Sequence, residues 1–252
     1  MKAETIVLNN VRGVTLTAYV QEPVGKIWQI VTRPAVLVIP GGAYRFCSER
    51  EADPVALAFL AAGYQTFVLR YTVGADMVWP QPLEDYEQAM QLIRANAGRW
   101  MLYPNKIAVV GFSAGGHLAG CAATISKNRP NAAILGYALL TDDVKEYNRA
   151  APDLCAAVDA ATCPCFLFAA RTDETVPVRN TLRFAAALEE HGVNFETHIY
   201  ASGPHGFSTA QSAVQDPRTI CPRTADWVGE SIAWLKDVFG DFEGEAASVS
   251  CD

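Results

Sequence analysis

The segment Gly111-Phe112-Ser113-Ala114-Gly115 is the only G-x-S-x-G pattern in the chain. The four apolar residues 107–110 before it are typical of a strand, and the small residues 114–126 after it are typical of a helix. A strand that turns sharply into a helix presents a serine hydroxyl at the tip of the turn, and the glycines leave room for that turn. This context favours Ser113 as a nucleophile over an incidental serine in a glycine-rich turn.

Four histidines are candidates for the general base. His205 lies in a late loop after the expected strand 195–200, which suits the chain order serine, acid, histidine. His117 follows Ser113 by one helical turn and points away from the tip, so we expect it to pack in the interior. His191 stands at the expected end of a helix, and His198 lies within an expected strand. We therefore predict His205 as the base.

The acid that orients this histidine is predicted in the loop after the apolar segment 165–170. Asp173 stands there, between the nucleophile and the histidine in chain order. A carboxylate at this place has to hold the imidazole tautomer and stabilise its cation. Glu174 beside it, and Asp142 and Asp143 after an earlier strand, are the alternatives. Asp173 is preferred because it directly follows its strand.

A second glycine turn, residues 40–44, follows the apolar run 35–39. A loop at this place can direct a backbone N–H at the oxyanion of an acyl-transfer reaction, and the residue after the nucleophile supplies another. The predicted donors are Ala43, or Gly42 in its place, together with Ala114; a simple loop is the alternative. Four further side chains near strand ends are candidates to line the substrate cleft, although packing explains the aromatic ones equally well: Tyr44, Arg45, Tyr71 and Trp79.

Strand-like and helix-like segments alternate along most of the chain. The expected strands are 14–20, 35–39, 66–69, 107–110, 133–140, 165–170 and 195–200, and the expected helices are 50–62, 83–97, 114–126, 178–191 and 225–239. This alternation predicts the α/β class, with a mainly parallel sheet and helices on both faces. A polar connection is expected over 21–34. We predict one domain over residues 1–252, with a catalytic core from about 14 to 238 and an acidic, frayed tail from 240 to 252.

Composition excludes several classes of protein. The 252 residues carry a formal net charge of −7, which disfavours a nucleic-acid or anionic-membrane partner. The seven cysteines are odd in number and irregularly spaced, so we expect reduced, packed thiols in the cytoplasm and no metal site. The N-terminal residues have no apolar run suited to a signal peptide, and no stretch approaches the length of a membrane span.

With these residues in place, the chain resembles the α/β-hydrolase superfamily, and within it small bacterial carboxylesterases of the acetyl esterase and acetylxylan esterase type. Segments 38–46, 49–52, 67–71 and 110–119, with those around Asp173 and His205, carry the resemblance. It implies a central sheet of about eight strands with a short cap. The chain departs from the pattern at Pro40 and Ala43, where related esterases often have His and a third Gly. The segment 141–164, where relatives often have a longer cap, is short.

The resemblance implies ester hydrolysis through an acyl-enzyme intermediate, with short-chain and especially acetyl esters as substrates and acetylated xylo-oligosaccharides among them. The expected partner is a small-molecule or oligosaccharide ester, and no cofactor is expected. A peptidase, arylformamidase or lactone hydrolase is the alternative on the same scaffold, because fold does not determine substrate. A non-catalytic ligand-binding relative is a third hypothesis. A homo-oligomer is left open.

Overall fold

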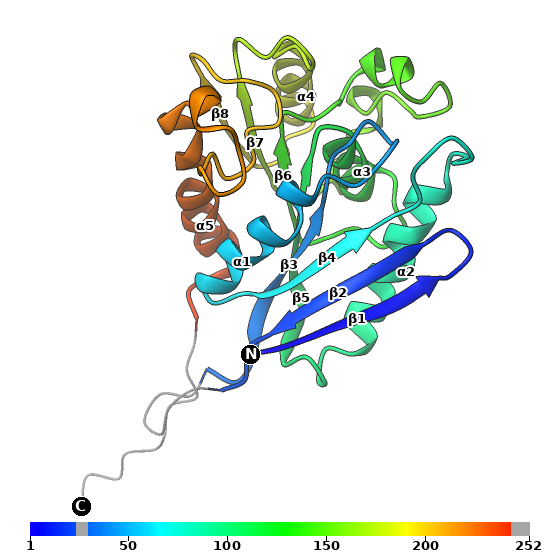
Figure 1. The fold of residues 1–252 in the computed structure, drawn as a ribbon, viewed down its shortest axis with the longest axis vertical. Coiled ribbons are helices and arrows are strands. Elements are labelled where there is room, and N and C mark those ends of the chain that lie inside the picture. Colours follow the sequence, from blue (N-terminus) through cyan, green and yellow to red (C-terminus); the bar gives the residue numbers. More distant parts are fainter. Residues whose placement is uncertain (24–29, 243–252) are drawn as a thin grey trace, which may run out of the picture.

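The structure, a computed structural model, describes residues 1–23 and 30–242, and these form an eight-stranded sheet in the order β1-β2-β4-β3-β5-β6-β7-β8 (Figure 1). The strands are β1 (Lys2–Asn9), β2 (Val14–Val20), β3 (Arg33–Ile39), β4 (Gln65–Arg70), β5 (Leu102–Phe112), β6 (Ala132–Gly136), β7 (Cys165–Ala170) and β8 (Phe195–Tyr200). β1 pairs antiparallel with β2, and β2 antiparallel with β4. All other neighbours are parallel, which confirms the predicted fold class.

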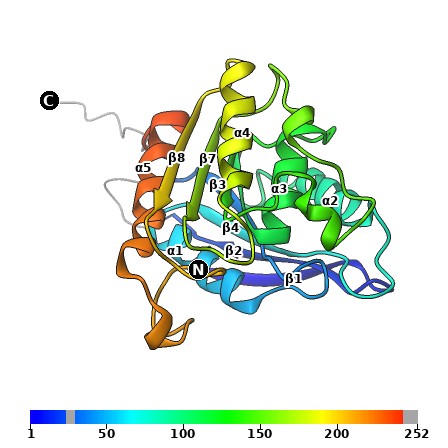
Figure 2. The same cartoon turned by 90° about the horizontal axis from the view of Figure 1, so that it is seen from above.

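Helices cover both faces of this sheet, as predicted. They are α1 (Asp53–Ala61), α2 (Gln81–Ala95), α3 (Ser113–Thr124), α4 (Arg179–Glu190) and α5 (Asp226–Phe239). Figure 2 shows α1 and α5 on one side of the sheet and α2, α3 and α4 on the other. Successive residues of β3 point to opposite faces, so Val38 packs in the cluster with α1 and α5, whereas Leu37 packs in the cluster with the other three.

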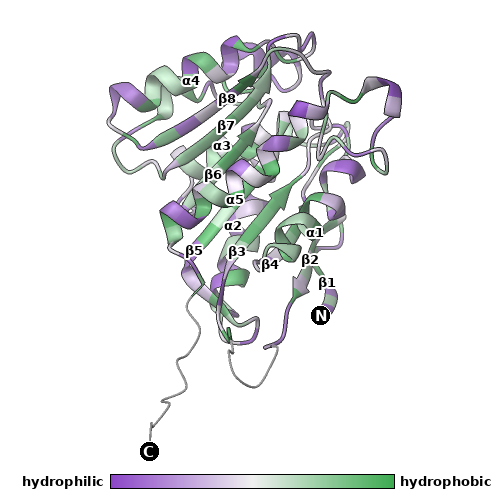
Figure 3. Ribbon diagram, turned by 90° about the vertical axis from the view of Figure 1, so that its left-hand side faces the viewer, coloured by the Kyte–Doolittle hydropathy of each residue, from purple (hydrophilic) through white to green (hydrophobic). Residues whose placement is uncertain are grey.

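Burial on both faces explains why the central strands are continuous apolar runs. All seven residues of β3 and all six of β7 are buried. In Figure 3 β7 and most of β3 are hydrophobic, whereas α4 alternates between hydrophobic and hydrophilic residues. The expected bounds 165–170 and 195–200 agree with β7 and β8, because long apolar or alternating runs flanked by polar turns delimit strands well.

Three expectations about elements were wrong. The run 133–140 ends as a strand at Gly136, because Tyr137 has a φ of 34° and turns the chain out of the sheet while it stays buried. The helix expected over 50–62 divides into a 3₁₀ turn, Glu49–Glu51, and α1, which begins at Asp53. β1 lies before the expected start of the core at residue 14; its residues are only partly buried, so its apolar signal is weak.

The carboxyl ends of the parallel strands lie at one edge of the sheet, and the loops that follow them meet there. The polar connection expected over 21–34 falls partly on residues 24–29, outside the described part of the chain. Most of the expected tail, residues 243–252, also lies outside it, while Phe242 packs edge-on against Tyr64 with ring centroids 5.4 Å apart. In the described ranges, no helix combines the length and apolar character needed to cross a membrane.

Candidate active site

Ser113 stands at the junction of β5 and α3, in the strand-turn-helix setting predicted for it. It is the first residue of α3 and has a φ of 53°, a left-handed value that a serine rarely adopts. The turn needs glycine on both sides. A Cβ on Gly111 would lie 2.3 Å from the Gly115 carbonyl oxygen, and a Cβ on Gly115 would lie 2.2 Å from the Pro40 carbonyl oxygen. Close backbone packing therefore holds the serine in its strained conformation.

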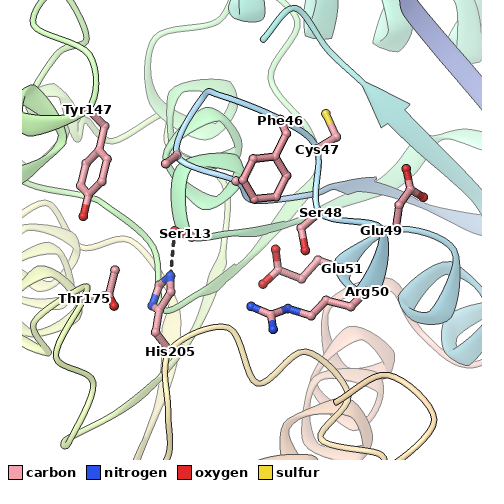
Figure 4. A pocket seen from close by; sticks show the side chains of 12 residues that line it. Phe46, Cys47, Ser48, Glu49, Arg50, Glu51, Ser113, Tyr147, Thr175 and His205 are labelled. Atoms are coloured by element: carbon pink, nitrogen blue, oxygen red, sulfur yellow. Dashed lines mark hydrogen bonds between the residues drawn. The ribbon is translucent and has the colours of Figure 1, made fainter. Parts of the chain in front are cut away.

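The predicted base and acid come to Ser113 from two separate loops. His205 follows β8, and its Nε2 lies 3.0 Å from Ser113 Oγ (Figure 4). Its Nδ1 lies 2.7 Å from Oδ2 of Asp173, which follows β7. Ser113 and Asp173 are 92 and 32 residues away from His205 in the sequence. The structure thus brings the three predicted residues into one hydrogen-bonded line.

The surroundings of Asp173 determine which nitrogen of His205 carries a proton. The Asp173 side chain is fully buried, and its Oδ1 accepts the backbone N–H groups of Thr175 at 2.8 Å and Val176 at 2.9 Å. Both oxygens therefore act as acceptors, so the Nδ1–H of His205 donates to Oδ2. The Nε2 lone pair is then free to accept the Ser113 hydroxyl proton, which is the tautomer that a general base needs. Glu174, the neighbouring alternative, is exposed.

The glycine turn after β3 lies beside Ser113. Gly42 has a φ of 129° and Ala43 a φ of 56°, and both residues line the same cavity as Ser113 and His205. Gly42 cannot take a side chain, since a Cβ there would lie 2.0 Å from the Phe46 carbonyl oxygen. Ala114 is in the first turn of α3, where backbone N–H groups have no partner within the helix. The predicted oxyanion donors therefore lie on the glycine turn and on the first turn of α3, which meet at the nucleophile.

The cavity at this site has a volume of about 620 Å³, within the range of ligand pockets. Its wall includes residues that the sequence did not single out as substrate contacts: Phe46, Cys47, Ser48, Glu49, Arg50, Glu51, Tyr147 and Thr175 (Figure 4). Six of them continue the glycine turn directly, which is the signal that could have found them. Tyr147 comes from the short segment 141–164, so this segment forms one wall, and nothing in its sequence marks that tyrosine.

The four predicted cleft residues are placed differently from one another. Tyr71 is 2% exposed and donates its hydroxyl to the Pro40 carbonyl oxygen at 2.9 Å, so it supports the glycine turn from the interior. Trp79 is half-buried and packs edge-on against Tyr44. Tyr44 and Arg45 line a second cavity that shares Ala43 and Tyr147 with the first. None of the four lines the cavity that contains Ser113 and His205.

His117 is an interior residue, as expected, and it connects three segments. Its Nε2 lies 2.9 Å from the Pro152 carbonyl oxygen, which can only accept, so Nε2 carries the proton. Its Nδ1 therefore accepts the Tyr44 hydroxyl, 2.7 Å away. Burial lowers the pKa of His117 to about 4 and keeps the ring neutral. The side chain thus ties the oxyanion turn to α3 and to the segment 141–164.

The other candidate side chains are engaged away from the site. His191 caps α4 through a 2.9 Å contact with the Ala187 carbonyl oxygen, and His198 lies beside Glu196 at 2.6 Å. Asp143 pairs with Arg179 at 2.8 Å, and this contact contributes to the lowering of its pKa against the opposing effect of burial. The six cysteines within the described residues are free thiols; Cys251 lies outside that part, and the cytoplasmic location stays a prediction. Among the described residues, no three metal-ligating side chains gather in a cluster.

The family BD-FAE matches residues 29–151, and the prolyl oligopeptidase family matches residues 140–231. The first range contains the glycine turn and Ser113, and the second contains Asp173 and His205. Together the two families therefore cover every residue of the hydrogen-bonded line.

Two curated relatives are similar over most of the chain. Identity is 34% over 211 residues with endo-1,4-beta-xylanase B of Butyrivibrio fibrisolvens, and 30% over 198 residues with an acetylxylan esterase of Xylanibacter ruminicola. These alignments cover 71% and 69% of this chain but only 33% and 41% of the two relatives. The chain therefore spans less than half the length of either relative.

A solved structure matches the chain at nearly full length. MGS-M1, an alpha/beta hydrolase enzyme from a Medee basin deep-sea metagenome library, is 41% identical to this chain. The match covers 94% of this chain and 98% of that one, with a TM-score of 0.88. The chain belongs to the α/β-hydrolase family.

Proposed function

We propose that this protein is a serine carboxylesterase that hydrolyses short-chain esters, acetyl esters above all, and that it removes acetyl groups from xylo-oligosaccharides. The observation that carries the proposal is the line of contacts from Asp173 Oδ2 through His205 to Ser113 Oγ, with its serine end in a cavity. The acetyl-xylan part is supported by the similarity to an acetylxylan esterase.

The first half of the reaction acylates the serine. Ser113 Oγ attacks the acyl carbonyl carbon while its proton passes to His205 Nε2, and Asp173 stabilises the resulting imidazolium. The negative carbonyl oxygen accepts the N–H groups of Ala114 and of Ala43, or of Gly42 in its place. One such donor contributes about 10²–10³ in rate. The imidazolium then gives its proton to the alcohol oxygen, and the alcohol leaves.

The second half releases the acid. Water gives a proton to His205 Nε2 and attacks the acyl carbon, and the oxyanion is held by the same N–H groups. When this intermediate collapses, the bond to Ser113 Oγ breaks and the proton returns from His205 to that oxygen. Each proton taken by the imidazole is thus returned within one cycle, and the chemistry needs only the side chains and backbone described above.

A panel of p-nitrophenyl acyl esters and acetylated xylo-oligosaccharides tests this proposal. We expect hydrolysis that declines as the acyl chain lengthens, and complete loss in Ser113→Ala. Ser231→Ala is the matched control, because this buried serine bonds within α5 to the Val228 carbonyl oxygen. A wild type that cleaves no ester of the panel contradicts the esterase proposal, and undiminished activity in Ser113→Ala removes this serine as the nucleophile.

Peptide hydrolysis is the second candidate, because the prolyl oligopeptidase family matches the range that contains the base and the acid. The same mechanism cleaves amides when the leaving nitrogen is protonated in place of the alcohol oxygen. Acyl-peptide p-nitroanilides added to the panel separate the two candidates. A higher kcat/KM on the anilides than on the acetyl esters would favour the peptidase.

A further inference from the structure

Glu51 is a buried carboxylate at the active-site cavity that the proposed reaction does not use. It ends the 3₁₀ turn Glu49–Glu51, is only 2% exposed, and lines the cavity that contains Ser113 (Figure 4). A buried carboxylate costs free energy unless each of its oxygens finds a donor. We therefore expect donors to both oxygens of Glu51 at this place beside the nucleophile.

Each oxygen of Glu51 is bonded to a different part of the site. Oε2 accepts the backbone N–H of Gly41 at 3.0 Å, directly before the predicted oxyanion donors Gly42 and Ala43. Oε1 accepts the hydroxyl of Tyr137 at 2.8 Å, from the strained residue after β6. The Gly41 contact spans 10 residues and closes the loop after β3, whereas the Tyr137 contact spans 86 residues and joins segments far apart in the sequence.

Tyr137 continues the connection to the loop that carries His205. Its hydroxyl oxygen accepts the backbone N–H of Ser208 at 3.1 Å, and its ring meets the imidazole of His205 edge-on with centroids 5.1 Å apart. The Ser208 hydroxyl in turn donates to the carbonyl oxygen of Arg50 at 2.5 Å. The turn containing Glu51 is therefore bonded to the histidine loop by two routes. It is bonded to the oxyanion turn through Gly41, whose carbonyl oxygen also accepts the N–H of Ser48 at 2.9 Å.

We propose that Glu51 is a positioning residue, whose carboxylate holds the oxyanion turn and the His205 loop in one fixed arrangement around Ser113. The proposal rests on the function proposed above. Acylation needs the oxyanion donors on one side of Ser113 and the base on the other, and a misplacement of about 1 Å costs about 10²-fold in rate. A carboxylate is required, because both donors point at it and the Tyr137 hydroxyl also accepts from Ser208.

Glu51→Gln and Tyr137→Phe test this role. The amide of glutamine has a single acceptor oxygen, so it accepts from Gly41 or from Tyr137 but not from both. We expect Glu51→Gln to lower kcat on p-nitrophenyl acetate by about 10–100-fold with KM changed by less than about threefold. The affinity of an alkylboronic acid, which mimics the tetrahedral intermediate, should fall in parallel. The double variant should lose less than the product of the two single losses, because both changes weaken the same connection from Gly41 through Glu51 to Tyr137.

Asp85→Asn is the matched control for burial and charge. Asp85 is fully buried and accepts the Thr72 backbone N–H at 2.8 Å and an Arg12 guanidinium at 2.5 Å, outside the cavity. We expect it to lose stability in denaturant unfolding but to keep the kcat of the folded enzyme. A Glu51→Gln enzyme with kcat within threefold of wild type overturns the proposal. So does a double variant whose loss equals the product of the two single losses.

Amide hydrogen exchange supplies a readout that does not depend on turnover. Glu51→Gln should speed exchange in both 40–46 and 203–210, whereas Asp85→Asn should leave both unchanged. If the wild type cleaves no ester but the variant loosens both loops, the function proposed above fails and the role of Glu51 stands. Unchanged exchange in either loop overturns the positioning role whatever the activity.

Discussion

Six residues other than glycine have positive φ angles in the segments around the active site: Ala43, Tyr44, Ser113, Tyr137, Ser208 and Ala210. At the antiparallel edge of the same sheet, β1 and β2 pair in a regular ladder with one irregularity near Val7, and their connection turns at Gly13, where glycine has free space. Each left-handed residue other than glycine costs about 1–3 kcal/mol and persists only where its surroundings impose it.

The difference lies in what holds each edge. Around the site, buried side chains such as His117 and Glu51 bond directly to the strained loops. At the β1 edge, the side-chain contacts include exposed pairs such as Arg99 with Glu4, in which the side chains are 57% and 36% exposed. Buried polar contacts hold their geometry tightly and are costly to break, whereas exposed pairs contribute little. Substitutions at the two edges should therefore differ in size and in what they affect.

The largest effect is expected from Asp173→Asn. An amide in this place must turn its NH₂ or its oxygen toward His205, and it cannot accept the N–H groups of Thr175 and Val176 together with Nδ1–H as the carboxylate does. The imidazole loses its orientation and its tautomer, so kcat should fall by about 10⁴-fold. Steady-state hydrolysis of p-nitrophenyl acetate measures this. A loss below tenfold would mean that another carboxylate serves His205.

Gly115→Ala should come next. The added methyl group would lie 2.2 Å from the Pro40 carbonyl oxygen and 2.3 Å from that of Ile39, and backbone cannot move aside easily. We expect a loss of about 4 kcal/mol in the free energy of unfolding, with little activity left. Gly229→Ala in α5 is the control, since its Cβ would meet nothing within 4 Å. In Gly229→Ala, the free energy of unfolding measured in urea should rise by about 0.5–1 kcal/mol. A similar change in Gly115→Ala and Gly229→Ala would contradict close packing at the serine turn.

Acid should weaken the site edge through His117. Its pKa is about 4 in the folded protein and about 6.5 when unfolded, so the unfolded chain binds the extra proton first as the pH falls. The stability present above pH 6.5 is lost progressively down to pH 4, by about 3 kcal/mol in all. Urea unfolding across this range tests it. In His117→Gln, the free energy of unfolding should lose this part of its dependence on pH. An unchanged dependence on pH would mean that other groups cause it.

Tyr44→Phe should have a smaller effect. It removes the hydroxyl that donates to His117 Nδ1 and leaves a buried nitrogen without its partner. We expect a loss of about 2 kcal/mol in the free energy of unfolding and a decrease in kcat, because Tyr44 directly follows the predicted oxyanion donor Ala43. Tyr86→Phe is the control: this buried tyrosine donates to the Asn128 carbonyl oxygen at 2.9 Å, away from the site. It should lose stability without loss of kcat.

The smallest effect is expected at the β1 edge. Arg99→Ala breaks an exposed pair with Glu4, which keeps its 2.7 Å bond from the Trp100 indole N–H. We expect the free energy of unfolding, measured in urea, to fall by less than about 1 kcal/mol and kcat to stay unchanged. A loss as large as that of Tyr44→Phe would remove the contrast between the two edges.

Most of the fold was predictable from the sequence, because strands buried on both faces leave long apolar runs and helices leave a periodic pattern. Two of the errors have opposite physical causes. Tyr137 and its neighbours stay buried after they leave the sheet, so the apolar run 133–140 does not show where the strand ends. β1 failed in the opposite way, since a half-exposed edge strand lacks an apolar signal.

The candidate site also has a part that the sequence could predict and a part that it could not. The sequence could predict that Ser113, Asp173 and His205 lie close together, because each stands after a strand and parallel strands bring their following loops to one edge. The residues of the cavity wall could not be predicted in this way. Tyr147 lines the cavity but lies in a segment with no regular pattern, whereas Tyr71, which the sequence offered as a cleft residue, packs in the interior.

The order of the elements and the tight serine turn follow from the sequence, because hydrophobic periodicity and glycine spacing act over a few residues. Which buried polar side chains bond to one another depends on the packing of the folded chain. Glu51 is joined to Tyr137 across 86 residues. Contacts of this range depend on how loops from separate strands pack against one another, and no local pattern of residues encodes that.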